Sequence, residues 1–281
     1  MISSGVQQSG KVRTDPEPSL AWWPGFKNQN VGDAWLSFLT AFKNLLDFAG
    51  RRAHFLTMVK KEPPTDKGEQ TRQHIFECAL ALFREKGFDA TTMQDVAARA
   101  ELAKSATYYY FPSKEAIVQA YYESVQAEQE RISAESLAQH NDLKSRLRAA
   151  MQTKFDLVKD DRKLLGVVFR YTGEPDHPLS CLGKGTADIR RRSIEIFRQA
   201  IAGEKLPHDL ELLLPMALWA LQMGLLVMFL YDGSANQRRT RRMADGALEL
   251  TSKLLGLAKL PVLKPVRIKI LALLQEAELL A

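Results

Sequence analysis

Apolar residues recur every three to four positions along most of the chain, and no stretch alternates apolar and polar residues as a half-buried strand does. The pattern therefore predicts an all-α protein. It predicts helices at about 69–86, 92–100, 103–110, 114–136, 142–160, 162–172, 185–203, 208–231, 236–257 and 265–280. The longest break of the C-terminal half lies at residues 173–185, where two prolines interrupt the pattern.

The segments before residue 69 follow a different pattern. Residues 1–30 are rich in Ser, Gly, Gln, Asn and Pro, a composition typical of disorder. Residues 33–50 place their apolar side chains on one helical face and predict an amphipathic helix. A polar linker follows at 58–68. Four basic residues lie in or near it: Lys60, Lys61, Lys67 and Arg72. They either form an arm along a DNA backbone or are solvated linker charge.

Charge and chemistry narrow the function. The net charge is +6, but residues 58–125 hold nine basic and ten acidic residues, so bulk charge is no evidence for DNA binding there. With Cys78 and Cys181 alone, the chain has no disulfide framework and no four-cysteine zinc site, which fits a reducing cytosol. His177 and Cys181 are four apart, but two ligands do not make a metal site. We predict no catalytic residue, metal or cofactor, because phosphate-loop and nucleophile motifs are absent from the sequence.

Three short predicted helices with a tight turn match the helix-turn-helix arrangement, in which the third helix enters the major groove. Within it, the stretch from Ala79 to Ile117 resembles the N-terminal domain of the TetR family of transcriptional regulators. The resemblance rests on Leu82, Phe83, Gly87, Phe88, Thr91, Thr92, Val96, Ala97, Tyr108, Phe111, Ser113, Lys114 and Glu115. Glu101 stands where the family usually has glycine, so we expect it to tolerate a left-handed backbone and to bring an acid near the DNA.

The resemblance implies a DNA-binding domain at 69–115 and a ligand-binding and dimerisation domain at 116–281. It implies base or groove contacts from Gln94, Lys104, Ser105, Ala106 and Tyr109, and phosphate contacts from Thr92, Tyr108, Tyr110 and Lys114. Hydroxyls, amides and lysine suit those roles. The alternative is that Tyr108 and Phe111 are core residues; consecutive aromatics on a short helix cannot all point inward, so at least one of Tyr109 and Tyr110 is expected to be exposed.

The segment Leu212–Tyr231 has the length of a membrane span, with Gln222 as its one strongly polar residue. A helix that is apolar all round is also found buried on every side. We favour the second interpretation, because the family implied by resemblance forms homodimers through the corresponding helices, here about 208–231 and 236–257. The alternative is a membrane-associated or partner-binding protein with a degenerate helix-turn-helix.

The resemblance further implies a cytoplasmic, ligand-responsive homodimeric repressor that binds a near-palindromic operator. A small apolar effector would bind among helices of the C-terminal domain and favour a dimer arrangement that releases the DNA. Candidate lining residues are Phe155, Phe169, Tyr171, Trp219, Met223 and Met228, with ordinary core packing as the alternative for each.

Residues 1–57 lie outside the resemblance. Met58 begins a stretch that looks like a natural start for the family, whereas the amphipathic pattern at 33–50 is uncommon in an untranslated frame. We favour a start-site error over a translated extension that packs on the core or docks a partner.

Overall fold

The computed structural model describes residues 66–172, 174 and 176–276, and this part of the chain is built of α-helices and 3-10 turns without strands. The predicted helix at 33–50, the start at Met58, and Lys60 and Lys61 of the predicted arm lie outside the described residues. The helices are α2 (Asp66–Lys86), α3 (Met93–Arg99), α4 (Lys104–Tyr110), α5 (Lys114–Gln139), α6 (Leu143–Val158), α7 (Arg162–Arg170), α8 (Ala187–Ala200), α9 (His208–Tyr231), α10 (Arg238–Ala258) and α11 (Lys264–Glu276). The 3-10 turns are η3 (Lys184–Thr186), η4 (Ala235–Gln237) and η5 (Pro261–Leu263). The all-α prediction is confirmed, and the helix ends differ from it by a few residues.

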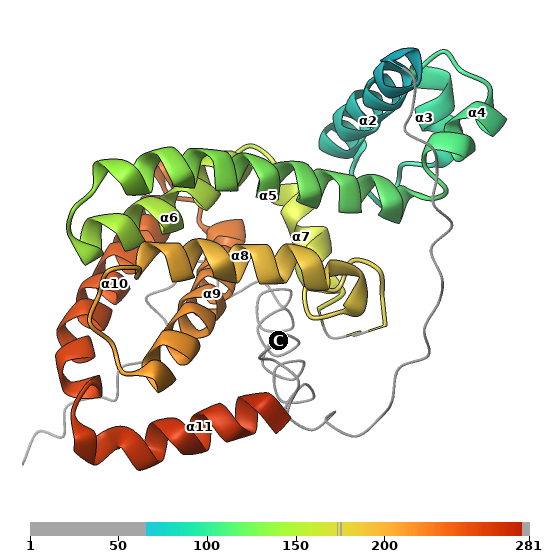
Figure 1. The fold of residues 1–281 in the computed structure, drawn as a ribbon. Helices are drawn as coiled ribbons and strands as arrows, with labels where there is room; N and C mark the ends of the chain where they lie inside the picture. Colours follow the sequence, from blue (N-terminus) through green and yellow to red (C-terminus); the bar gives the residue numbers. More distant parts are fainter. Residues whose placement is uncertain (1–65, 173, 175, 277–281) are drawn as a thin grey trace, which may run out of the picture.

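Helices α2, α3 and α4 lie together at one end of the molecule, beside the start of α5 (Figure 1). Local signals set their ends. Gly87 follows α2 with φ +88°, a backbone angle that glycine adopts freely. Thr92 caps α3 in a capping box with Asp95. Glu101 has φ +55°, so the turn between α3 and α4 does hold a left-handed glutamate.

The α2–α4 unit has an apolar core of its own, and helices α5 to α10 pack around another one. In it the rings of Phe155 and Phe229 stack with centroids 5.1 Å apart, which joins α6 to α9. Figure 1 shows α5 running the length of this helical body from the α2–α4 end. Residues of α5 pack against the core of the α2–α4 unit and against the core of this helical body, so α5 connects these two packing units directly.

Helix α9 is the one described helix long and apolar enough to cross a membrane. Within the protein, 56% of its most apolar stretch is buried, and the helix contacts α6, α7, α8, α10 and α11. Burial by neighbouring helices accounts for its composition, so the anchor interpretation is not favoured.

The last helix, α11, lies where the pattern predicted a C-terminal helix, and it packs on α9. Arg267 is buried there; its Nε donates to Asp209 Oδ2 at 2.5 Å, and it also donates to the Ala258 and Leu260 carbonyls. This ion pair holds the pKa of Asp209 below its usual value. The outer faces of α10 and α11 remain apolar and exposed, including Met243, Leu250, Leu254, Leu257, Val266, Ile270 and Leu273.

Candidate functional site

Helix α4 presents most of its surface outward. Among its residues only Thr107 is fully buried, while α3 buries Val96 and Ala97 against the rest of the unit. The predicted DNA contacts Thr92, Gln94, Lys104, Ser105, Tyr108 and Tyr109 are exposed, and Ala106, Tyr110 and Lys114 are half-buried. All nine residues are therefore at least partly accessible, on α4, at the start of α3 and at the start of α5.

The aromatic residues of α4 divide between surface and core. Tyr109 is 65% exposed and Tyr108 is 42% exposed, whereas Phe111 is 2% exposed. The core interpretation is thus confirmed for Phe111 and wrong for Tyr108, because Tyr108 lies on the outer side of the short helix. Lys104 Nζ lies 5.8 Å from the Tyr108 ring centroid, so a cation and an aromatic face share one exposed patch.

Two residues that are predicted to contact DNA phosphates, Thr92 and Lys114, already have hydrogen-bond partners inside the protein. The hydroxyl of Thr92 accepts from Asp95 N at 3.1 Å and donates to the Asp95 carboxylate at 2.7 Å. Lys86 pairs with the same carboxylate at 2.8 Å, and these contacts lower the pKa of Asp95. Lys114 Nζ donates to the Phe88 carbonyl at 2.8 Å. Both residues hold the ends of α3 and α5 in place around the exposed patch.

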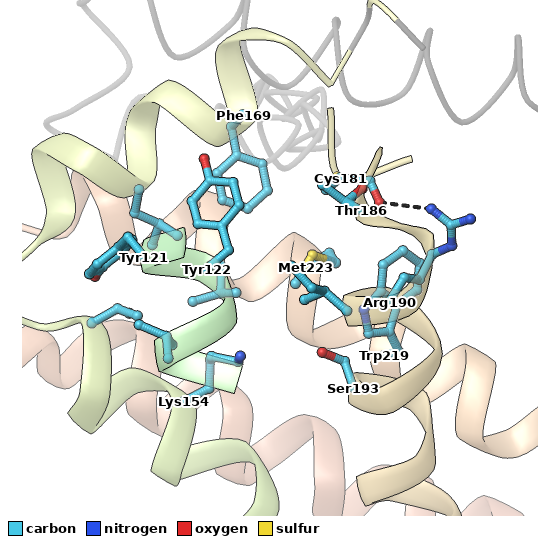
Figure 2. Close-up of a pocket in the computed structure, with 15 residues that line it drawn as sticks. Tyr121, Tyr122, Lys154, Phe169, Cys181, Thr186, Arg190, Ser193, Trp219 and Met223 are labelled. Carbon is cyan, nitrogen blue, oxygen red and sulfur yellow. Dashed lines mark hydrogen bonds between the residues drawn. The ribbon is translucent and has the colours of Figure 1, made fainter. Parts of the chain in front are cut away.

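A cavity of about 90 Å³ lies between α5, α6, α7, α8 and α9 (Figure 2). Its apolar lining consists of Tyr121, Tyr122, Val125, Val158, Leu165, Phe169, Ile189, Trp219, Met223 and Leu226. Its polar lining consists of Lys154, Cys181, Thr186, Arg190 and Ser193. The cavity is therefore an apolar space with a few polar groups at its margin, which is typical of small-molecule sites.

Three of the predicted lining residues, Phe169, Trp219 and Met223, line this cavity. The other three lie elsewhere. Phe155 is fully buried and stacks on Phe229. Tyr171 stacks on His177 with centroids 3.6 Å apart, and Met228 packs against the main core from its margin. Apolar type alone did not separate the residues that fill the core from those that border the cavity.

Two residues of the polar margin, Lys154 and Ser193, donate to Gln126 of α5, which is buried outside the cavity lining. Its Oε1 accepts from Ser193 Oγ at 2.5 Å and from Lys154 Nζ at 3.3 Å. Its amide nitrogen donates to Glu130, whose carboxylate is also held by Arg192 at 2.7 and 2.9 Å. Burial lowers the pKa of Lys154 to about 8, the largest effect on that group, while Glu130 opposes the shift.

An ion pair between a half-exposed arginine and a buried aspartate joins the α2–α4 unit to the larger helical body. Arg84 of α2 donates to both carboxylate oxygens of Asp161 at 2.5 and 3.0 Å. Tyr121 of α5, which lines the cavity, donates its hydroxyl to Asp161 at 3.0 Å. A second, exposed pair joins Arg170 of α7 to Asp89 at 2.6 Å. One hydrogen-bonded chain therefore runs from the cavity wall to α2.

Helix α7 contributes to both packing units. Leu164 and Val167 belong to the core of the α2–α4 unit. Leu165 and Phe169 line the cavity from the other side of the same helix. A molecule in the cavity that displaced α7 would consequently also change the contacts between α7 and α2.

Among the described residues, no group of three or more His, Cys, Asp or Glu side chains is placed to hold a metal ion. His177 Nδ1 accepts from Leu179 N at 3.2 Å, and the Cys181 sulfur lies 3.4 Å from the Thr172 hydroxyl. Burial raises the pKa of the Cys181 thiol.

The sequence matches two family descriptions that together span both packing units. Residues 75–121 match "Bacterial regulatory proteins, tetR family", and residues 146–267 match "Tetracyclin repressor-like, C-terminal domain". The chain belongs to the TetR family of bacterial regulatory proteins. Its helix-turn-helix unit is accordingly that of a TetR-family transcriptional regulator.

Similar proteins agree with this assignment. Over 44 residues, 16% of this chain, the sequence is 48% identical to the uncharacterized HTH-type transcriptional regulator YuxN of Bacillus subtilis. Over 46 residues, also 16%, it is 41% identical to the biofilm operon icaADBC negative regulator IcaR of Staphylococcus aureus. These matches span only 15% and 25% of the relatives' own lengths.

Solved structures share the fold more widely. A putative TetR-family regulator from Syntrophomonas wolfei superposes with a TM-score of 0.53 at 19% identity, covering 69% of this chain and 98% of that one. The TetR regulator from Nitrosomonas europaea gives 0.54 at 17% identity, covering 65% and 98%.

The cavity of this TetR-family protein includes residues that the sequence analysis missed. Lys154 is the clearest, because the buried residues of α6 include Leu147, Met151, Phe155 and Val158 on the same stripe. A lysine at a core position of an amphipathic helix is a signal that the sequence carries. Ser193 likewise lies on the buried stripe of α8 with Ile196, Phe197 and Ala200, whereas Tyr122 and Arg190 offered no comparable signal.

Proposed function

We propose that this TetR-family regulator is a ligand-responsive repressor that acts in the cytoplasm and binds a near-palindromic operator as a homodimer. The observation that carries the proposal is the exposed polar and aromatic surface of α4, with α3 packed behind it. Base or groove contacts come from Gln94, Lys104, Ser105, Ala106 and Tyr109, and phosphate contacts from Thr92, Tyr108, Tyr110 and Lys114. Thr92 and Lys114 would reach phosphates by rearranging the contacts they make in the free protein.

The second copy docks on the outer face of α9 and α10. Met243, Leu250 and Leu254 are each about half exposed on α10, spaced seven and four residues apart on one face. Large apolar side chains in a contiguous row support an interface between protein chains. Two α4 helices one turn of DNA apart, roughly 34–36 Å, suit two half-sites of an operator.

The effector acts by shifting the dimer between two arrangements, and its effect is bounded by its differential affinity for them. Two contacts support coupling from the cavity to α2: the Tyr121–Asp161–Arg84 chain and the two-sided packing of α7. Helix α5 runs through both units and adds a third connection.

The test is a gel-shift titration of the purified protein on DNA from upstream of its own gene, at two stated salt concentrations. The Lys104→Ala/Tyr109→Ala variant is compared with Lys163→Ala, which changes an exposed lysine far along the chain in α7. Saturable binding that the double variant loses and the control keeps supports the proposal. Loss of binding to the same extent in both variants, or binding by the double variant equal to the wild type, contradicts it.

A further inference from the structure

The cavity wall combines a large apolar area with a cluster of hydrogen-bond donors. Lys154 Nζ and Ser193 Oγ both reach Gln126 Oε1, at 3.3 and 2.5 Å, so their head groups are neighbours. Figure 2 shows them turned toward the same part of the cavity, below Tyr122 and Met223. The cavity is therefore apolar in its body and cationic at one margin.

The charge of Lys154 is not neutralised by a direct partner. Lys154 is 8% exposed, and no carboxylate of a described residue forms an ion pair with it. Glu130 is the acid that acts on it electrostatically, and the Glu130 carboxylate is bound by Arg192 and Gln126. An unpaired buried ammonium is costly, so a site that keeps one is poised for an incoming anion.

Two further polar groups line the cavity away from Lys154 and Ser193 (Figure 2). The hydroxyl of Tyr122 is buried and has no hydrogen-bond partner among the described residues. Arg190 lines the cavity and donates only to the carbonyls of Cys181 and Gly183, at 3.1 and 3.3 Å, without an ion pair in the described chain. Two cations at the margin disfavour a cationic ligand, and a neutral apolar ligand would leave the ammonium unpaired.

Resting on the proposed function, we propose that the effector is an amphipathic anion, with an apolar body against Phe169, Trp219 and Met223 and an acidic head group that accepts from Lys154. Ser193 donates a second hydrogen bond to the head group after releasing Gln126. The shared chemistry is one negative head on a compact apolar body, and it covers both carboxylates and phosphate monoesters.

The experiment is isothermal titration of the full chain with hexanoate, octanoate and decanoate, with octan-1-ol and octylammonium as head-group controls, and with octyl phosphate as the second acid. Lys154→Met removes the ammonium at similar length, and Lys154→Gln is a second variant if the first fails to fold. Lys163→Met is the matched control, since it removes an exposed lysine outside the cavity.

We expect an acid to bind at least tenfold more tightly than the alcohol of the same length. Lys154→Met should lower acid affinity about tenfold or more, leave octan-1-ol affinity unchanged, and differ from Lys163→Met, which should match the wild type. The comparison of octanoate with octyl phosphate then identifies which acid the site prefers.

Equal affinity for acid and alcohol, tighter binding of octylammonium, or full acid affinity in both Lys154 variants would each overturn the proposal. No binding of any probe by a chain that still binds its operator also overturns it. Acid binding by a chain without saturable operator binding supports the anion site and instead contradicts the proposed repressor function.

Discussion

Lys154→Met is expected to stabilise the fold, although it replaces a buried side chain. The lysine makes one long hydrogen bond, 3.3 Å to Gln126 Oε1, and that acceptor keeps its 2.5 Å bond from Ser193. Methionine matches the apolar neighbours of the stem and fills similar space. The difference in the free energy of unfolding between the variant and the wild type is therefore dominated by the buried charge of Lys154.

The magnitude follows from the lowered pKa. The unfolded value is 10.5 and the folded value about 8, so the folded state holds the proton less tightly and the charge costs about 3 kcal/mol at pH 7. The cost is fully present below pH 8 and is relieved as the pH rises from 8 to 10.5. At pH 9.5 it falls to roughly half of that cost. After the lost hydrogen bond is subtracted, the variant should be more stable by about 2 kcal/mol at pH 7.

The assay is urea unfolding followed by circular dichroism at pH 7 and pH 9.5, at one fixed protein concentration because a dimer's stability depends on it. The difference between wild type and variant isolates Lys154 from other groups that titrate in this range. The control Lys163→Met should change the free energy of unfolding by no more than about 0.5 kcal/mol at either pH. A variant less stable than the wild type at pH 7, or a difference that does not narrow at pH 9.5, would refute the reasoning.

Three further substitutions probe other contacts. Arg84→Met leaves the buried Asp161 carboxylate with fewer donors and should cost about 1–2 kcal/mol, discounted because the Arg84 side chain is 51% exposed; a double-mutant cycle with Asp161→Asn that shows no coupling contradicts this. Glu101→Gly relieves a left-handed backbone and removes an acid near α4, so we expect about 0.5 kcal/mol of added stability and tighter DNA binding; a lower melting temperature is the opposing result. If the proposed dimer forms through α10, Leu250→Lys with Leu254→Lys should yield a monomer in sedimentation velocity, and a dimer that persists would place the interface elsewhere.

Local chemistry explains why the helices could be predicted closely. The bond that the Thr92 hydroxyl accepts from Asp95 N, the reciprocal bond that the Asp95 carboxylate accepts from Thr92 N, and the positive φ of Gly87 are each set by residues within a few positions of one another. Such signals are readable in one dimension. The family resemblance rested on the same region, so the helix-turn-helix was the most predictable part of the molecule.

The cavity and the coupling contacts depend on residues far apart in the chain. Arg84 and Asp161 are separated by 77 positions, and Gln126 and Ser193 by 67. Neither pair has a spacing that a periodic pattern encodes, since tertiary packing alone brings them together. For the same reason Phe155 and Phe169 were indistinguishable in the sequence, although one fills the core and the other borders the cavity.

The two-sided packing of α7 has a consequence for how this sequence can change over evolution. One residue turns an α-helix by about 100°. A single insertion or deletion inside α7 would therefore rotate Leu164 and Val167 off the α2–α4 core and carry Leu165 and Phe169 off the cavity at once. Substitutions on either side can alter one contact at a time, whereas a change of length alters both. Among relatives that keep both contacts, we expect α7 to vary in sequence and to hold its length.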